Sequence, residues 1–326
     1  MKKLGKKKRI LILSVAAAVL IVAAIFACVF WARNTEERLS AIAIDEEHFP
    51  DIKFRAFVSL YYDEDEDSVL SGDERRQVKE CLVSGMRLRD LKGIEFFPEL
   101  RTLECSDNEL ARLDVSQNPE LRMLNLTSNN VVTLDLSHNP RLQVLACSYN
   151  VLLSLDVSSN PGLKELVCDG NQLSDMDLSQ NKRLVSFSCW DNKLQSLDVS
   201  GCTLLSDINC GKNKLTSLNL TGCSNLCDLM CQGNQLTSLE VAGFTKLTMI
   251  YCSNNKLTSL KTDGCTELLI LDCANNSLTD LSVTGCSKML DLSCNGNALR
   301  SLDVSTCTSL ERLEYYDNPM TVRDIR

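Results

Sequence analysis

The sequence predicts a mostly β solenoid, in which each 21-residue turn carries two short extended segments and the first segments of successive turns stack into a parallel sheet. A small helical cap is expected before the solenoid, and one transmembrane helix before the cap. Three observations lead to this fold class: an asparagine that recurs every 21 residues, an acidic loop behind an amphipathic helix, and a long apolar run near the N-terminus.

Composition narrows the function classes before any motif is considered. The 326 residues carry a formal net charge of -9, which argues against nucleic acid as a partner because such binding needs clustered lysine and arginine. A hydrophobic content of 44% excludes wholesale disorder. With 2 histidines, no G-x-S-x-G motif and no phosphate loop, the sequence offers no catalytic constellation. We therefore expect no enzyme and no organic cofactor.

The N-terminal segment has the pattern of a membrane anchor. Residues 1–9 include six basic side chains, and residues 10–32 form an uncharged apolar run. As a helix this run would extend ~35 Å, enough to cross the hydrocarbon core of a bilayer. Because the basic residues precede the run, we expect residues 1–9 to be cytoplasmic and residues 10–32 to be an uncleaved signal anchor. A linker over residues 33–43 would then lead to an extracellular remainder.

Two processed forms are the alternatives to this anchor. Cleavage after Ala32 would place bulky Phe30 where a signal peptidase prefers a small residue. The stretch Ile25-Phe26-Ala27-Cys28 resembles a bacterial lipobox, which would attach a lipid to Cys28. Phe26 and the apolar residues after the cysteine fit that motif poorly, so the uncleaved anchor fits the sequence better.

Residues 44–98 differ in composition from the rest and predict a small helical cap. Phe54, Phe57, Val58 and Tyr61 follow the i, i+3, i+4, i+7 spacing of an amphipathic helix. The stretch 88–98 is interpreted as a degenerate first repeat that joins the cap to the solenoid. We expect the cap to cover the open edge and apolar core of the first turn.

The acidic loop behind this helix, residues 63–74, resembles the calcium-binding loop of an EF-hand, with acids at positions 1, 3, 5 and 12. A hard cation prefers oxygen ligands, and the predicted Ca²⁺ ligands are Asp63, Asp65, Asp67, the Val69 carbonyl, Ser71 through a water, and Glu74.

One position departs from the EF-hand pattern. Position 6 is Ser68 instead of glycine, and a left-handed turn without glycine costs about 1 kcal/mol, so weak binding is expected. The alternative interpretation is a solvated acidic turn followed by a capping box, because Ser71 and Glu74 also fit S-x-x-E at a helix start.

Residues 99–326 follow one repeated line, L-x-x-L-x-C-x-x-N-x-L-x-x-L-D-V-S-x-N-x-x, in about eleven units. Its first asparagine recurs without insertion at Asn108, Asn129, Asn150, Asn171, Asn192, Asn213, Asn234, Asn255, Asn276, Asn297 and Asn318. One unit is too small to bury its own leucines, whereas stacked units share a continuous core. In L-x-C the leucine and the cysteine should point inward. The asparagine should turn inward and bond backbone groups of neighbouring turns.

This line resembles the leucine-rich repeat, in the short form of internalin-like and other surface proteins of Gram-positive bacteria. The resemblance covers residues 99–326 and implies a protein- or glycan-binding solenoid at a cell surface. It also implies that a helical or EF-hand-like segment can precede the repeats, as residues 44–98 suggest.

Most of the 17 cysteines occupy two positions of the repeat. Nine take the inward position of the first strand: Cys105, Cys147, Cys168, Cys189, Cys210, Cys231, Cys252, Cys273 and Cys294. Five replace the second asparagine of the unit (Asn118, Asn139, Asn160, Asn181) in later repeats: Cys202, Cys223, Cys265, Cys286 and Cys307. Disulfides or a soft-metal ladder are the functional alternatives. Stacked neighbours lie ~4.8 Å apart with parallel side chains, a poor geometry for disulfides, so we expect unpaired core thiols.

The second extended segment of the unit, as in Leu134-Asp135-Leu136, closes the other side of the turn. It carries a column of acids: Asp114, Asp135, Asp156, Asp177 and Asp198. Such a column suits cations or a basic partner, but a local bond from each aspartate to the backbone of the following turn is the stronger interpretation.

The outward residues of the first strands, with those just after them, should form one face roughly 50 Å long. Apolar anchors among carboxylates are typical of a protein interface. The candidate binding residues are Trp190, Met230, Met249, Tyr251, Ile270, Asp207 and Asp228. The alternative is that these are ordinary scattered surface residues without a partner.

Three functions remain open from the sequence. The first is a monomeric, membrane-anchored extracellular module for binding or adhesion, which recognises a protein or glycan at a Gram-positive-type surface. The second is a structural spacer of the envelope. The third is a calcium-responsive surface sensor, in which the acidic loop regulates the repeats.

Overall fold

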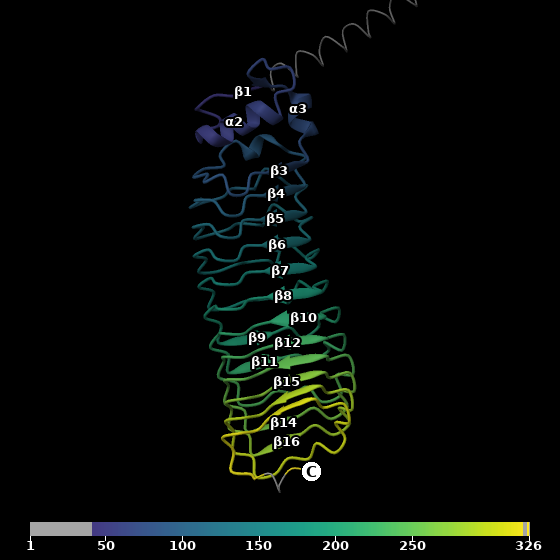
Figure 1. Ribbon diagram of the computed structural model, residues 1–326. Helices are drawn as coiled ribbons and strands as arrows, with labels where there is room; N and C mark the ends of the chain where they lie inside the picture. Colours follow the sequence, from purple (N-terminus) through teal and green to yellow (C-terminus); the bar gives the residue numbers. More distant parts are fainter. Residues whose placement is uncertain (1–40, 322–324, 326) are drawn as a thin grey trace, which may run out of the picture.

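The computed structural model describes residues 41–321 and residue 325, and Figure 1 shows a cap at one end of a long stack of turns that follow sequence order. The predicted anchor at 10–32 lies outside the described residues, as does nearly all of the linker at 33–43. Within the described part of the chain, no helix combines the length and apolar character that crossing a bilayer requires.

The cap consists of β1 (Ile42–Ala43), α2 (Ile52–Tyr61), β2 (Val69–Leu70) and α3 (Gly72–Gln77), with β1 and β2 paired antiparallel. Helix α2 begins after Asp51, whose carboxylate accepts bonds from the N–H groups of Lys53 and Phe54. Phe54 and Val58 are fully buried, as the helical spacing predicts. Tyr61 is 64% exposed because it lies at the last residue of the helix, where its ring packs on Phe57.

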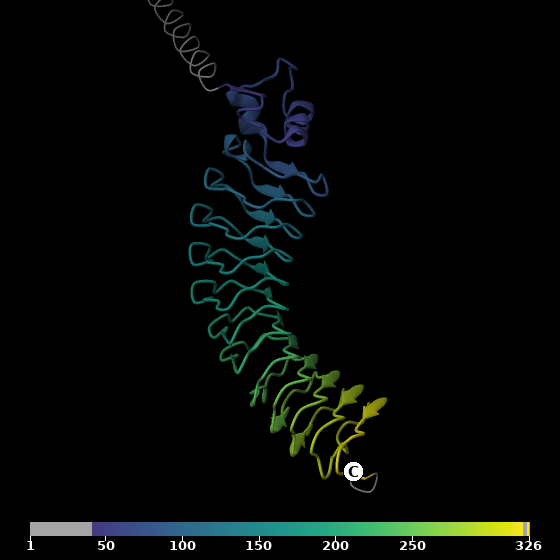
Figure 2. The same cartoon turned by 90° about the vertical axis from the view of Figure 1, so that its left-hand side faces the viewer.

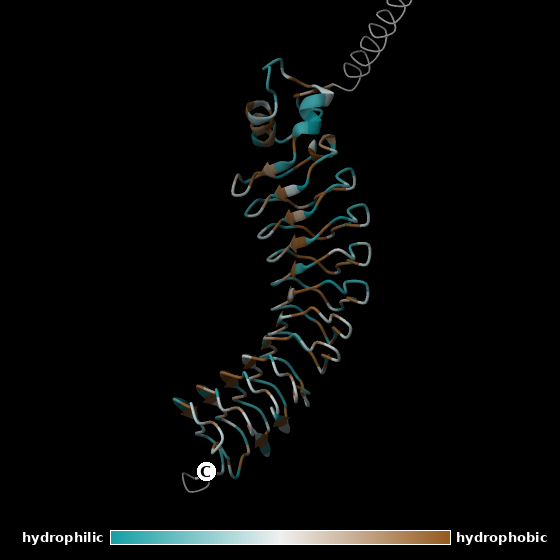
Figure 3. Cartoon of the chain, turned by 90° about the vertical axis from the view of Figure 1, so that its right-hand side faces the viewer, coloured by the Kyte–Doolittle hydropathy of each residue, from teal (hydrophilic) through white to brown (hydrophobic). Residues whose placement is uncertain are grey.

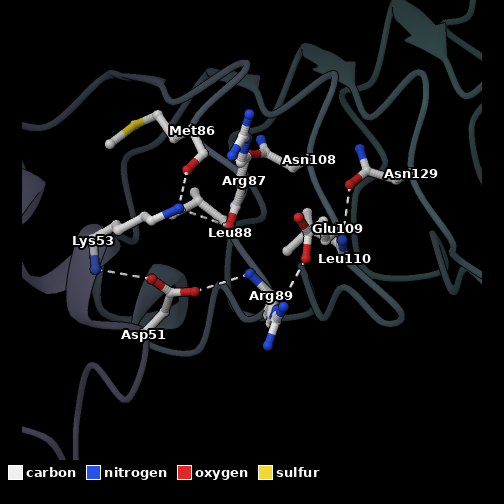
Figure 4. A network of polar contacts seen from close by, with 10 residues as sticks. All are labelled: Asp51, Lys53, Met86, Arg87, Leu88, Arg89, Asn108, Glu109, Leu110 and Asn129. Atoms are coloured by element: carbon white, nitrogen blue, oxygen red, sulfur yellow. Dashed lines mark hydrogen bonds and ion pairs between the residues drawn. The ribbon is translucent and has the colours of Figure 1, made fainter.

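Polar contacts join the start of α2 to the first turn of the solenoid, as Figure 4 shows. The second carboxylate oxygen of Asp51 accepts the N–H of Arg89 at 2.9 Å, and Lys53 Nζ donates to the carbonyl of Met86 at 2.9 Å. Burial acts to raise the pKa of Asp51, but hydrogen bonds from backbone N–H groups, first of all that of Arg89, outweigh burial and hold that pKa below its usual value. The cap is therefore fixed to the repeats as expected.

Twelve short strands form one parallel sheet in which each strand pairs in register with the next turn. They are β3 (Glu80–Leu82), β4 (Thr102–Glu104), β5 (Met123–Asn125), β6 (Val144–Ala146), β7 (Glu165–Val167), β8 (Ser186–Ser188), β10 (Asp207–Asn209), β12 (Asp228–Met230), β13 (Met249–Tyr251), β15 (Ile270–Asp272), β17 (Asp291–Ser293) and β18 (Arg312–Glu314). Figure 2 shows that the stack curves and that this sheet lies on its concave side.

The sheet begins one turn earlier than the sequence indicated. Strand β3 pairs with β4 through Cys81 and Leu103, which are 22 residues apart, and Val83 is buried on the same side of the strand. The stretch 88–98 instead holds a short 3-10 helix, η1 (Ile94–Phe96). The 22-residue spacing and the changed residue types explain why the repeated line did not reveal β3.

The core is the column of inward side chains that the repeat predicts. In β6, for example, Leu145 is fully buried, Ala146 is half-buried, and Cys147 just after the strand is fully buried. Figure 3 shows the hydrophobic residues gathered on the strand segments and hydrophilic ones at the outer loops. Stacking thus gives a continuous apolar core that one turn could not form alone.

The first asparagine of each unit points inward, as predicted. Asn171 is 7% exposed, and its Nδ2 donates to the carbonyls of Cys147 at 3.0 Å and Cys168 at 3.1 Å. Its Oδ1 accepts the N–H of Leu152 at 3.0 Å. The other ten asparagines of the column make equivalent bonds, which satisfy backbone groups that the turns would otherwise bury unpaired.

The second extended segment forms strands only in later turns. These are β9 (Ser196–Asp198), β11 (Ser217–Asn219), β14 (Ser259–Lys261) and β16 (Asp280–Ser282), paired as β9 with β11 and β14 with β16. In the earlier turns the segment holds no strand, and the amide of the second asparagine bonds two carbonyls of the preceding turn. The second extended segments therefore pair as strands only in the later turns, whereas the first segments pair in every turn.

The sixteen cysteines among the described residues are free, and fifteen are buried, which confirms unpaired core thiols over that range. Burial raises the pKa of Cys147 and of Cys210 to about 12, so these thiols stay protonated and unreactive at neutral pH.

Candidate binding face and cap loop

The sheet face, defined as the outward side chains of the parallel sheet and the two residues after each strand, brings most of the predicted binding residues together. Asp207, Asp228, Met249 and Ile270 stand side by side on β10, β12, β13 and β15, since each strand pairs in register with the next. Met230 pairs with Tyr251 on the same strands. All six are half-buried by their neighbours.

Trp190, two residues after β8, is held in a fixed position on this face. Its backbone N–H donates to the Asp169 carboxylate at 2.7 Å, and Lys212 Nζ lies 4.4 Å from the ring centroid. Gly211 of the next turn leaves room for the ring, because a Cβ there would approach Trp190 Cδ1 to 3.1 Å. A rigid aromatic with one open side is a typical anchor for a binding partner.

Carboxylates on the face are partly desolvated. Burial raises the pKa of Asp228, and the neighbouring Asp207 adds to the rise, while a hydrogen bond from Thr248 Oγ1 at 2.8 Å opposes it. Burial likewise raises the pKa of Asp169. Partial removal of water from these carboxylates strengthens their attraction for a cation.

The C-terminal part of the face is hollowed into a recess of about 430 Å³, lined in part by Tyr251, Ile270 and Asp272. Arg312 spans its far side and forms ion pairs with Asp291 at 3.1 Å and Glu314 at 2.7 Å. Asp291 and Arg312 are not among the binding residues predicted from the sequence. The 21-residue register would have found them, because both continue the column of Met249 and Ile270.

The predicted calcium loop is only partly assembled. Carboxylate oxygens of Asp63, Asp65 and Asp67 lie within 4.8 Å of one another, and Asp63 is 6% exposed. Ser68 adopts the left-handed conformation expected at position 6, with a φ of 66°. The slight desolvation of Asp65 and the nearby charge of Asp67 raise the pKa of Asp65. Three of the predicted ligands thus form a concentrated site of negative charge.

The other predicted ligands have structural partners. Val69 belongs to β2. Ser71 and Glu74 form a capping box at α3, in which Glu74 accepts the Ser71 N–H at 2.7 Å. The second oxygen of Glu74 accepts the N–H of Glu64 at 2.8 Å. The capping box is therefore present, and Glu74 points back into the loop it closes.

The column of aspartates on the second segment has the local role preferred from the sequence. Asp114, Asp135 and Asp156 each accept the N–H of the serine two residues later, at 2.9 Å. That bond is the main cause of the lowered pKa of Asp114 and of Asp156, whereas for Asp135 the serine hydroxyl comes first.

No protein-family model and no curated protein sequence matches the chain. Among solved structures, the functional domain of InlJ from Listeria monocytogenes, described as including a cysteine ladder, matches with a TM-score of 0.79 and 32% identity. That match covers 85% of this chain and 62% of the InlJ chain. The internalin InlF of Listeria monocytogenes matches with a TM-score of 0.67 and 20% identity, over 86% of this chain and 93% of its own. The LRIM1/APL1C complex matches with a TM-score of 0.66 and 22% identity, over 78% of this chain and 51% of the matched chain.

The protein has the leucine-rich-repeat fold, a β-solenoid of about 11 turns. Its structural neighbours are internalin-like leucine-rich-repeat proteins. This chain spans less than two thirds of the InlJ chain that it matches.

Proposed function

We propose that this protein is a membrane-anchored surface module that binds a protein partner through its sheet face. The internalin-like neighbours support a protein-binding or adhesion role, and one solved neighbour is itself a complex, that of LRIM1 with APL1C. The observation that carries the proposal is the fixed position of Trp190 beside half-buried apolar and acidic side chains on adjacent strands.

Rigidity of the face supports binding in energetic terms. Side chains already held by neighbouring turns lose little conformational freedom when a partner docks, so more of the contact energy appears as affinity. Tyr251 and Trp190 supply the aromatic area that interface hot spots favour, and Asp207 and Asp228 supply a rim of charge. A glycan that stacks on the same aromatic rings is the second candidate partner.

The test places a photo-crosslinking residue at Tyr251 or, as a matched control, at exposed Asp177 on the opposite side of the turn. The full chain is expressed on the cells that produce it and irradiated there. We expect a covalent adduct from position 251 that disappears when Trp190→Ala is added, and none from position 177. Equal adducts from both positions, or adducts that Trp190→Ala leaves unchanged, would remove the sheet face as the binding site.

Membrane anchoring is proposed on the uncharged run at 10–32 and the basic residues before it. The full chain should sediment with membranes and stay there at high salt, whereas a chain lacking residues 10–32 should be soluble. A cleaved or lipidated form would be recognised by mass spectrometry, since it would lack the first residues or carry acyl mass on Cys28.

Weak calcium binding by residues 63–74 is proposed as a second property. Three clustered carboxylates and the nearby Glu74 support it, because a hard cation prefers several oxygen ligands. Millimolar Ca²⁺ should raise the melting temperature of the cap, and Asp65→Asn should abolish the rise while Asp73→Asn leaves it unchanged. An identical melting temperature with and without Ca²⁺ would show that the loop is a capped turn that does not bind the ion.

A further inference from the structure

A groove on the flank of the solenoid, separate from the sheet face, gathers basic side chains. It encloses about 360 Å³ and its lining includes Arg122, Arg141, Gln143, Gly162, Lys164 and Arg183. None of these residues belongs to the predicted binding set, and the net charge of -9 gives no reason to expect a basic cluster. This basic groove therefore needs its own explanation.

Two columns of the repeat build the groove. Arg122, Gln143 and Lys164 each stand directly before a first strand, and backbone bonds stack them, since Gln143 N–H donates to Arg122 O and Lys164 N–H to Gln143 O, both at 2.8 Å. Arg141 and Arg183 stand three residues before β6 and β8. Successive turns are ~4.8 Å apart, and the four cations come from the four successive turns of β5, β6, β7 and β8.

Gly162 occupies the second column between Arg141 and Arg183. With no side chain it leaves a hollow between the two guanidinium groups, and a Cβ added there would lie 3.2 Å from the carbonyl oxygen of Leu142. The floor of the groove is thus open because that turn has a glycine where its neighbours have arginines.

The cations of the groove are largely uncompensated. Arg122, Lys164 and Arg183 form no ion pair with any residue in 41–321, and Arg141 pairs with Glu120 of the preceding turn. Glu165, the first residue of β7, follows Lys164 in the chain and does not line the groove. The charge that these side chains place on the flank is therefore mostly free to attract an external anion.

The chemistry of the groove favours tetrahedral oxyanions arranged in a chain. The planar fork of arginine matches phosphate and sulfate groups with two parallel bonds. One exposed ion pair contributes little, whereas several made by one molecule add together. No aromatic side chain lines the groove, so it lacks the stacking platform that single-stranded nucleic acids use.

We propose that the basic groove binds a linear polyanion that carries phosphate or sulfate groups. This site is independent of the sheet face and of the proposed protein partner. Its occupant would run along the flank across the turns that hold Arg122 to Arg183, with one oxyanion in the hollow at Gly162.

The test measures binding of the full chain, in detergent, to polyphosphate and to a sulfated polysaccharide of equal charge. The variant Arg122→Glu with Arg183→Glu should lose at least tenfold in affinity for whichever polymer binds. The control is Lys246→Glu with Lys288→Glu, which changes the net charge equally in the same column of later turns, where both lysines already have partners. It should change the affinity less than twofold.

A second variant changes the shape of the groove without changing its charge. Gly162→Leu fills the hollow and should weaken binding severalfold at unchanged net charge, with an unchanged melting temperature as the check on folding. If the variant with Arg122→Glu and Arg183→Glu fails to fold, the variant with Arg122→Gln and Arg183→Gln takes its place.

The outcomes separate the sources of the ligand. Binding of polyphosphate alone or of the sulfated polymer alone identifies the polymer, and binding of both supports the shared chemistry. The proposal is overturned if neither binds, if the groove and control variants lose affinity equally, or if inorganic phosphate at the same phosphate concentration binds as well as the polymer.

Discussion

The early turns of the solenoid, residues 100–183, and the late turns, residues 184–309, close their outer side with different side chains. In the early turns Asn139 and Asn160 each donate two bonds of 2.9–3.1 Å to carbonyls of the preceding turn. In five of the six late turns a thiol takes that place, and in the other one Phe244 does. The bonds of Cys223 and Cys265 to a carbonyl measure 3.4 and 3.2 Å. One architecture therefore tolerates a strong and a weak donor at the same position.

The difference shows how each side chain is compensated. The asparagine amide satisfies two carbonyls but leaves its own Oδ1 buried without a partner in Asn118, Asn139, Asn160 and Asn181. A thiol satisfies one carbonyl weakly and leaves no such oxygen. The late turns add backbone bonds instead, since their second segments pair as strands, for example Val199 N–H with Asn219 O at 3.1 Å. Early turns depend on side-chain amides, and late turns on backbone pairing and apolar packing.

The largest expected effect is unfolding of the late turns at high pH. Eleven repeat-position thiols lie in residues 184–309 and three in residues 100–183. Their folded pKa is raised, to about 11 in Cys223 and about 12 in Cys210, so their stabilisation is complete below 9.0, the ordinary thiol pKa. It falls as pH rises above that value, by about 1.4 kcal/mol per pH unit for each buried thiol.

Hydrogen exchange followed at pH 7 and after a brief exposure to pH 10.5 measures this loss of stability in each part of the solenoid. The late turns should lose protection while the early turns keep it. Loss of protection at the same rate along the whole stack would contradict the assignment of the difference to the thiols.

The next largest effect concerns the inner asparagine column. Asn171→Ala leaves the N–H of Leu152 buried without a partner and removes one of the two amide donors to the Cys147 carbonyl, so it should lower the free energy of unfolding by about 3 kcal/mol. Asn276→Ala removes equivalent bonds at a half-buried site, where water can replace them. It should therefore lower the free energy of unfolding clearly less than Asn171→Ala does. Urea titration of both variants compares the two regions, and equal losses would show that burial does not set the difference.

Exchanging the outer side chains tests the two solutions directly. Asn160→Cys loses two amide bonds but also removes the orphaned oxygen, so we expect a loss of about 1 kcal/mol, against about 2 kcal/mol for Asn160→Ala. The reverse change, Cys223→Asn, should also destabilise, because it adds volume to packed surroundings. Tolerance of both exchanges without loss would mean that the two regions are interchangeable.

The smallest expected effect is an acid sensitivity of the early turns. Backbone and hydroxyl bonds lower the pKa of Asp135, Asp156 and Asp177 in these turns, so their stabilisation is present above pH 3.8 and is lost as pH falls below that value. Asp156→Asn should remove part of this pH dependence while keeping the turn, as Asn219 does naturally by accepting the Thr221 N–H at 3.1 Å. Melting temperatures at pH 5 and pH 3 measure it, and an unchanged pH dependence would contradict this role.

Much of the fold follows from the sequence because stacking in register turns a linear repeat into columns. The inward leucine, cysteine and asparagine needed only the 21-residue spacing, and the aspartate turns needed only local chemistry. Strand β3 was missed because its turn is one residue longer and Cys81 replaces the usual leucine. The 21-residue spacing is the same in early and late turns, so it could not show that the second segments pair as strands only in the late turns.

The candidate sites were less predictable than the fold. Spacing placed Met249, Tyr251 and Ile270 on one face, but not the ion pairs of Arg312, which depend on side-chain conformation. In the cap loop the sequence predicted Glu74 both as ligand and as cap, and only the geometry shows the capping bonds. The basic groove escaped notice because its residues lie before the strands, not on them.

The central claim is that one continuous column of asparagines holds the turns in register. Its most direct test is the exchange rate of the N–H groups that donate to Asn Oδ1, including those of Leu152, Leu194 and Leu215. The column predicts that all of them exchange slowly and that Asn171→Ala accelerates the N–H of Leu152 far more than that of Leu215. Fast exchange in the unaltered protein, or equal acceleration at both leucines, would contradict it.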